Sequence, residues 1–252
     1  MMQLYKSNIN YLTIHAVDPD KRRYIIKNEG SHHYIDIDHY GKYPYDSLPH
    51  NWIKAKQKFS NDTLIKYGIL PWWILRTEQR LVTAFKEKNK KDILKLSADL
   101  GHYIGDAHVP LHSNTNHNGE QTGQEGIHAF WESRIPELFG DSKWNYFIGK
   151  ACYIENKDYF IWKIVLQSAA ASDTVLNIDK KLSTQFSEWK KYSYELKNHK
   201  LLKQYSTEYT TMYDDLLNHM TERRMRLSIY AIACFWYTAW VDAGQPDLTS
   251  LN

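Results

Sequence analysis

The chain has 252 residues, of which 42% are hydrophobic and 24% are charged, and its formal net charge at pH 7 is +3. This composition is that of a globular protein and excludes a disordered or collagen-like chain. The small net charge does not by itself indicate a nucleic-acid or anionic-membrane partner. The only two cysteines, Cys152 and Cys234, exclude a disulfide framework and a cysteine-based zinc site. A single bridge between them stays open, and we expect Cys234 to be a buried free thiol because it lies within an apolar run.

Apolar residues recur at helical spacing along most of the chain. They predict helices over residues 61–68, 71–91, 92–108, 127–139 (with Pro136 inside), 158–186 and 214–243. Residues 34–39 alternate between apolar and polar side chains but are too few to anchor a sheet, and the lysine-rich residues 179–204 are interpreted as a solvated face or loop. We therefore predict an all-α fold, a multi-helix bundle that forms a single domain over residues 1–252.

No segment has the features of a signal peptide or a membrane span. The first ten residues contain no apolar core. The most apolar stretch, residues 227–241, is too short to cross a bilayer comfortably and has charged residues close to both ends, which favours a buried helix. We predict that the chain is not transmembrane, and these features leave its cellular location open.

Five of the 12 histidines lie between positions 102 and 128, and such clustering indicates a metal site. His102 and Asp106 are four residues apart on a predicted helix, so their side chains share one face. His128 and Glu132 form a second such pair, and His112 follows the predicted end of the first helix. One pair of this kind is weak evidence. Two pairs and a further histidine, around a loop rich in Asn and Gly, favour a zinc site of imidazole and carboxylate ligands.

The other histidines and acids are less specific candidates. His108 lies about 240° around the helix from His102, so we expect it to point elsewhere. His117 lies in the polar loop and is a weak candidate. The N-terminal third contributes Asp18, Asp20, His32, His33, Asp36, Asp38 and His39. Spacing alone does not choose among these residues, and so dense a group could equally be a turn closed by Asx hydrogen bonds.

The segment HYIGDAHVPLH, followed by GIHAFWE, resembles the superfamily of zinc-dependent phospholipases C and single-strand-specific nucleases. The superfamily pattern is His, three residues, Asp, five residues, His, a loop, then His, three residues and Asp or Glu. The residues that match it are His102, Asp106, His112, His128 and Glu132. Upstream, the superfamily has an Asp and, about fourteen residues later, a His within a His-aromatic-Ile-Asp stretch. Asp18 and His33 fit this upstream pattern.

The resemblance implies an all-α fold with a trinuclear zinc cluster that hydrolyses phosphodiesters through a metal-activated water. Because the start of this chain differs, we expect two to three zinc ions. It assigns one zinc to Asp18, His33, His102 and Asp106. It assigns a second zinc to His112, His128 and Glu132, with Asp106 also reaching a third. In phospholipases of this type the residue that matches Asp18 is also a proposed general base. Members of the superfamily are typically exported, so the resemblance implies a periplasmic or secreted protein.

The start of the chain departs from the superfamily pattern. Mature members begin with a Trp whose amino group and carbonyl bind the third zinc, with help from a nearby His. This sequence begins Met1-Met2-Gln3, with no Trp before Trp52 and no His before His15. The expectation is either that the sequence begins downstream of that segment or that the third site is absent. His15 is the one nearby substitute ligand.

The last ligand bears on the substrate, because phospholipases have Glu at the position of Glu132 and the nucleases usually have Asp. Many of the nucleases also pair cysteines that this chain lacks. The aromatic residues Tyr34, Phe130 and Trp131 could stack on a base or enclose a choline, or they could be core residues. Arg22 and Arg23 could meet a substrate phosphate or form exposed ion pairs.

We therefore predict a zinc-dependent, phospholipase C-like hydrolase of phosphodiester bonds. One alternative is a single-strand nuclease or nucleotidase-like phosphodiesterase. The other is a non-catalytic zinc-binding helical protein, since a closed metal site is structural and an open one is catalytic. The expected partner is the phosphodiester substrate, a phospholipid head group or a nucleotide, and no stable protein partner is inferred.

Overall fold

The computed structural model describes residues 1–197 and 199–251, and it is mostly helical, with 64% helix and one two-stranded sheet. In these residues the α-helices are α1 (Met2–Ser7), α2 (Ile9–His15), α3 (Asp18–Arg22), α4 (Trp52–Phe59), α5 (Asn61–Lys66), α6 (Leu70–Lys86), α7 (Lys90–His108), α8 (Ile127–Ala129), α9 (Ile135–Phe139), α10 (Lys157–Ser183), α11 (Glu188–Lys191), α12 (Thr207–Leu216) and α13 (Met220–Asp242). The 3-10 turns are η1 (Glu29–His32), η2 (Ile37–Tyr40), η3 (Pro110–Ser113) and η5 (Thr249–Leu251). Between α8 and α9 lies the π-helical turn η4 (Phe130–Arg134).

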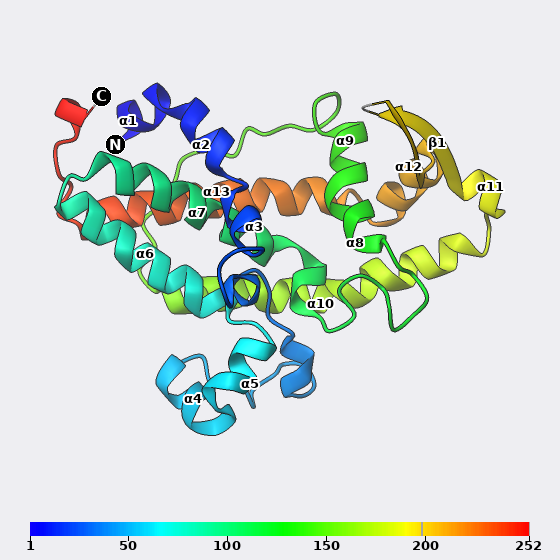
Figure 1. Ribbon diagram of the computed structural model, residues 1–252, viewed down its shortest axis with the longest axis horizontal. Coiled ribbons are helices and arrows are strands. Elements are labelled where there is room, and N and C mark those ends of the chain that lie inside the picture. The colour runs from blue at the N-terminus through cyan, green and yellow to red at the C-terminus, as the bar shows by residue number, and fades with distance from the viewer. Residues whose placement is uncertain (198, 252) are drawn as a thin grey trace.

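The core of the protein is built around α7. This helix packs against α2, α6, α10 and α13, and η3 lies against α10 (Figure 1). Both ends of the chain lie at one end of the molecule, whereas the hairpin lies at the other (Figure 1). A second apolar cluster forms where η4 and α9 meet α12 and the end of α10. Because α2 packs against α7 and η3 follows the end of α7 directly, the N-terminal segment and the histidine-rich loop both lie beside this helix.

The predicted helices over 61–68, 71–91, 92–108 and 158–186 are confirmed, with ends that differ by a few residues. Three of them, α5, α7 and α10, start with the polar caps that stabilise helices, whereas α6 has Pro71 in its first turn. Asn89 accepts a hydrogen bond from the Asp92 amide at 3.2 Å, and Asn156 accepts one from the Tyr159 amide at 2.9 Å. These caps satisfy amides that have no partner within the helix.

The predicted single helix over 214–243 is wrong at its start. Residues 214–216 end α12, and α13 begins at Met220. Between them Asn218 and His219 have φ angles of 51° and 54°, a left-handed conformation that a continuous right-handed helix cannot contain. His219 Nδ1 also pairs with Asp214 Oδ2 at 2.7 Å across this break.

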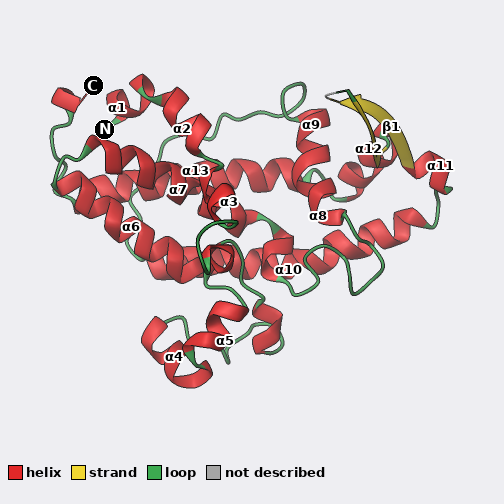
Figure 2. Ribbon diagram, viewed as in Figure 1, coloured by secondary structure: helices red, strands yellow, loops and turns green. Residues whose placement is uncertain are grey.

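The interpretation of 179–204 as a solvated face or loop is also wrong in part. Strands β1 (Tyr192–Lys197) and β2 (Lys200–Tyr205) form an antiparallel hairpin in which Tyr192 pairs with Tyr205 (Figure 2). The missed indication is the alternation of the six residues YSYELK, which has the period of a strand. Residues 34–39 form no strand, as predicted.

Both cysteines are free thiols, and Cys234 is buried as predicted. The backbone amide of Cys152 lies 3.2 Å from Cys234 Sγ, so the two segments are adjacent without a bridge. Residues 227–241 lie within α13, which packs on α6 and α7. Among the described residues, none of the helices combines the length and the apolar character that a bilayer span requires.

Candidate metal centre

Four side chains from three separate segments converge beside the last two turns of α7. We call Asp20, His33, His102 and Asp106 the first cluster. His102 Nε2 and Asp106 Oδ2, four residues apart on α7, lie 3.3 Å apart. His33, which follows η1, has its Nδ1 2.9 Å from the same Asp106 oxygen. Asp20 Oδ1, from α3, lies 3.7 Å from His33 Nδ1 and 3.8 Å from His102 Nε2.

The spacing of these donor atoms fits a small divalent ion. When four ligands surround zinc as a tetrahedron with bonds of about 2.0–2.1 Å, neighbouring donor atoms are about 3.3 Å apart. The separations around His33 Nδ1 are 2.9 Å to Asp106, 3.1 Å to His102 and 3.7 Å to Asp20, which bracket that value. Two imidazoles and two carboxylates are also a donor set that zinc accepts.

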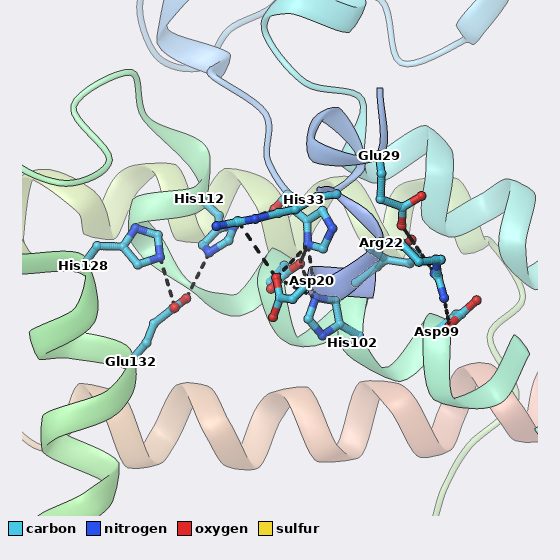
Figure 3. A network of polar contacts seen from close by, with 12 residues as sticks. Asp20, Arg22, Glu29, His33, Asp99, His102, His112, His128 and Glu132 are labelled. Carbon is cyan, nitrogen blue, oxygen red and sulfur yellow. Dashed lines mark hydrogen bonds and ion pairs between the residues drawn. The ribbon is translucent and has the colours of Figure 1, made fainter. Parts of the chain in front are cut away.

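The second cluster consists of His112, His128 and Glu132. Glu132 Oε1 lies 3.0 Å from His112 Nε2, and its other oxygen lies 3.0 Å from His128 Nε2. His112 comes from η3, whereas the other two residues come from α8 and η4. Figure 3 shows both imidazoles directed at the two oxygens of the one carboxylate.

Backbone carbonyls fix which nitrogen of each ring faces Glu132. His112 Nδ1 donates to the carbonyl of His33 at 2.5 Å, and His128 Nδ1 donates to that of His117 at 3.1 Å. With the ring proton on Nδ1, each Nε2 presents a lone pair to an anionic oxygen. Such an arrangement is repulsive unless a second proton or a cation lies between them. The arrangement of the second cluster therefore favours a proton or a metal ion between the imidazoles and the carboxylate.

The electrostatics of the second cluster lead to the same conclusion. Burial would lower the pKa of His112, but the charges of Asp106 and Glu132 outweigh it and raise that pKa to about 9. Burial would raise the pKa of Glu132, but its bonds to His112 and His128 hold it far below the usual range. A site that keeps its carboxylate ionised and attracts a proton to the His112 imidazole also attracts a metal ion in place of that proton.

The π-helical turn η4 explains how the second cluster is assembled. The predicted short helix over 127–139 is confirmed in its extent, because α8, η4 and α9 follow one another without a gap; its π-helical middle was not predicted. Pro136 lies in the first turn of α9, where a missing amide proton is tolerated, and the helix continues. A π turn widens the helix by one residue and is frequent at functional sites. Here it carries Glu132 between the two imidazoles.

The structure does not bring Asp18 to either cluster. Asp18 Oδ2 lies 2.6 Å from His15 Nδ1, and its other oxygen lies 2.9 Å from Lys21 Nζ. The pKa of Asp18 is lowered by these bonds, first by that to His15. Asp20 occupies the place predicted for Asp18, because residues two apart on α3 point about 200° away from each other. His15, the candidate substitute ligand, is likewise engaged with Asp18 outside both clusters.

The remaining histidines have structural partners. His108 is buried, and its Nδ1 lies 2.7 Å from the carbonyl of Ile104. Burial, followed by the charge of Arg224, lowers the pKa of His108 to about 3, so this ring is neutral. His108 belongs to neither cluster, as predicted. His32 stacks on Trp73, and His39 stacks on Tyr67.

The two acids that follow His33 lie outside the clusters. Asp38 accepts hydrogen bonds from the amide and hydroxyl of Thr115, at 3.0 and 2.6 Å, and so fastens the loop after His112. Asp36 is buried, and burial, aided by the charge of Asp38, raises its pKa to about 7. His117 contributes its backbone carbonyl to the second cluster, a role that no sequence pattern indicates.

The aromatic and arginine candidates have mostly structural roles. Phe130 and Trp131 are buried, and Phe130 stacks on Tyr205 in the second apolar cluster. Tyr34 donates its hydroxyl to the carbonyl of Lys66 at 3.0 Å. Arg22 is occupied by ion pairs with Glu29 and Asp99, and Arg23 lies 4.0 Å from Asp20.

A cavity of about 630 Å³ opens beside the clusters. Its walls include the ligand candidates His102, Asp106 and Glu132, together with apolar side chains such as Leu12, Ile232 and Trp236. Fold and site together define a helical protein with a candidate two-cluster metal centre next to a largely apolar cavity. In comparisons with known proteins, no protein-family model and no curated sequence matches the chain.

Proposed function

We propose that the chain is a zinc-dependent, phospholipase C-like hydrolase of phosphodiester bonds, a member of the phospholipase C and single-strand nuclease superfamily that binds two to three zinc ions. The observation that carries this proposal is the second cluster, in which two imidazoles with carbonyl-fixed Nδ1 protons face one carboxylate. A histidine with its ring proton on Nδ1 can bond that carboxylate through Nε2 only with a second proton or a metal ion between them. The neighbouring first cluster supplies four more donors.

Each cluster would hold one ion. The residues around the first would be Asp20, His33, His102 and Asp106, and those around the second would be His112, His128 and Glu132. Zinc bound by such ligands acts as a Lewis acid that polarises a phosphoryl oxygen and orients the substrate.

The residues of the chain perform the supporting steps. The carbonyls of His33 and His117 keep the protons of the second-cluster rings on Nδ1, so that Nε2 stays available. Asp20 is half exposed at the rim of the first cluster. We therefore transfer the proton-accepting role that the resemblance gives to Asp18 to the Asp20 carboxylate. The apolar cavity walls exclude water around the phosphodiester, which strengthens the charge interactions there.

A phospholipid head group fits this centre better than a base. The cavity beside the ligands is lined mainly by apolar side chains, and the aromatic residues next to Glu132 are packed in the core. Base stacking on Phe130 would require that ring to leave its contact with Tyr205.

The test is zinc content, followed by turnover, on the purified full chain. We expect at least two zinc ions per chain by elemental mass spectrometry. The variants His128→Ala and Glu132→Gln should each contain less zinc than the wild type. His39→Ala is the control, because His39 stacks on Tyr67 and lies outside every group of potential ligands among the described residues. We expect hydrolysis of short-chain phosphatidylcholine.

The other outcomes separate the alternatives. Turnover of single-stranded DNA alone would assign the nuclease branch, and bound zinc without turnover of any phosphodiester would leave a zinc-binding helical protein. A chain without zinc would refute the centre altogether.

A further inference from the structure

The loop between α3 and η1 exposes three consecutive apolar side chains. Tyr24 is 79% exposed, Ile25 is 85% exposed and Ile26 is 47% exposed. Ile25 is the most exposed large hydrophobic residue among those that the structure describes. Single exposed apolar residues are normal, but a contiguous group marks an interaction site. We call residues 23–28 the apolar loop.

The apolar loop is fixed in this outward conformation. The amides of Ile25 and Ile26 both donate to the carbonyl of Arg22, at 2.9 and 2.8 Å. At its base Arg22 Nη2 pairs with Glu29 Oε1 at 3.3 Å, and Nη1 pairs with Asp99 of α7 at 3.0 Å (Figure 3). Ion pairs therefore attach both ends of the loop to the core, and its apolar side chains remain exposed to solvent.

The charged residues between positions 21 and 28 are all basic. Lys21 and Arg23 precede the three apolar residues and Lys27 follows them. Lys21 pairs with Asp18 at 2.9 Å and Arg23 lies 4.0 Å from Asp20, which leaves Lys27 as the cation of the loop outside these two ion pairs. Arg23 lies over the Tyr24 ring at 5.4 Å. Aliphatic and aromatic side chains flanked by Lys and Arg are the composition of a surface that embeds in the boundary of an anionic bilayer.

We propose that the apolar loop docks the protein on an anionic lipid surface, with Ile25 and Ile26 embedded and the flanking cations against the head groups. A nucleic acid fits less well, because the two isoleucines offer no ring for bases to stack on. Asp20 lies on α3 directly before the loop, so docking would hold the first cluster against the bilayer. The proposal goes beyond the proposed hydrolase activity and does not depend on it, because docking is measured without turnover.

The test is binding of the full chain to vesicles, read by flotation. The vesicles are phosphatidylcholine alone or phosphatidylcholine with phosphatidylglycerol, and Glu132→Gln is run beside the wild type so that lipid turnover does not interfere. We expect Ile25→Ser with Ile26→Ser to lower partitioning onto the mixed vesicles at least about tenfold, given the apolar area lost. Lys27→Gln should lower it about fivefold on the mixed vesicles only.

Ile53→Ser is the matched control, because Ile53 is 62% exposed on α4 and lies outside the loop. This control should bind as the wild type does, and melting temperatures should show that all the variants are folded. The proposal is overturned by an absence of vesicle binding, by equal binding of the loop variants, or by an effect of Ile25→Ser confined to single-stranded DNA or to self-association. Vesicle binding without hydrolysis would refute the hydrolase alone, whereas hydrolysis of a soluble phosphodiester without vesicle binding would refute docking alone.

Discussion

Arg22 should be one of the most costly residues to replace outside the two clusters. Its guanidinium pairs with Asp99 at 3.0 Å and with Glu29 at 3.3 Å, and these two carboxylate side chains are only 7% and 5% exposed. Arg22→Met keeps an unbranched apolar side chain but removes the guanidinium, which leaves two buried carboxylates without their cation. Breaking a buried ion pair typically costs about 3–5 kcal/mol. Tyr103 still donates to Glu29, and Lys95 still pairs with Asp99, so we expect a loss of about 3 kcal/mol in the free energy of unfolding.

Urea denaturation at neutral pH measures this loss. The control is Arg226→Met, because Arg226 lies 3.8 Å from Glu222 in a solvated pair on α13, and we expect it to cost no more than about 0.5 kcal/mol. Adding Asp99→Asn to Arg22→Met should recover part of the loss, because one unpaired charge is removed. A cost below about 1 kcal/mol for Arg22→Met would refute the reasoning, since it would mean that the two carboxylates do not need this cation.

Three further predictions concern the metal centre and the helix break. With zinc at about a hundredfold excess over its Kd, a chelator should lower the melting temperature by about 5–10 °C, and Glu132→Gln should lose most of this shift in a thermal melt. Asp18→Asn should retain the zinc content of the wild type while Asp20→Asn lowers it; the reverse result by elemental analysis would restore Asp18 as the ligand. The pKa of His219 is raised, mainly by its bond to Asp214, so this pair stabilises the fold below the ordinary histidine pKa and loses its effect as pH rises through the raised value. His219→Gln should therefore lower the melting temperature at about pH 6 and leave it unchanged at about pH 9, and an equal effect at both would contradict the assignment.

The helical frame and most cluster members could be predicted because they depend on periodicity. His102 and Asp106 meet through the four-residue spacing of a regular helix, and so, nearly, do His128 and Glu132. Apolar spacing likewise indicated α5, α6, α7 and α10, whose starts have a polar cap or lie near Gly and Pro. These features are local, so a sequence pattern carries them.

The remaining features depend on geometry that no periodic pattern encodes. Asp18 and Asp20 lie almost equally far from His33 in sequence, and only the rotation of α3 decides which carboxylate reaches it. The carbonyls of His33 and His117 act through backbone atoms, which any residue possesses. The break at Asn218 and His219 requires two left-handed residues that are neither glycine nor proline, so it lacked the usual marker.

His33 serves the two clusters at once. Its ring nitrogen lies in the first cluster, while its own carbonyl holds the imidazole of His112 in the second. A shift of His33 therefore changes the geometry of both clusters. An ion bound by the His33 ring would also fix the position of the carbonyl that orients the His112 ring. Metal binding at one cluster should in this way raise the affinity of the other cluster for metal. Because such coupling is reciprocal, binding at the second cluster should raise the affinity of the first by the same factor. For the proposed zinc centre we therefore expect cooperative zinc binding, with few half-loaded molecules at any zinc concentration.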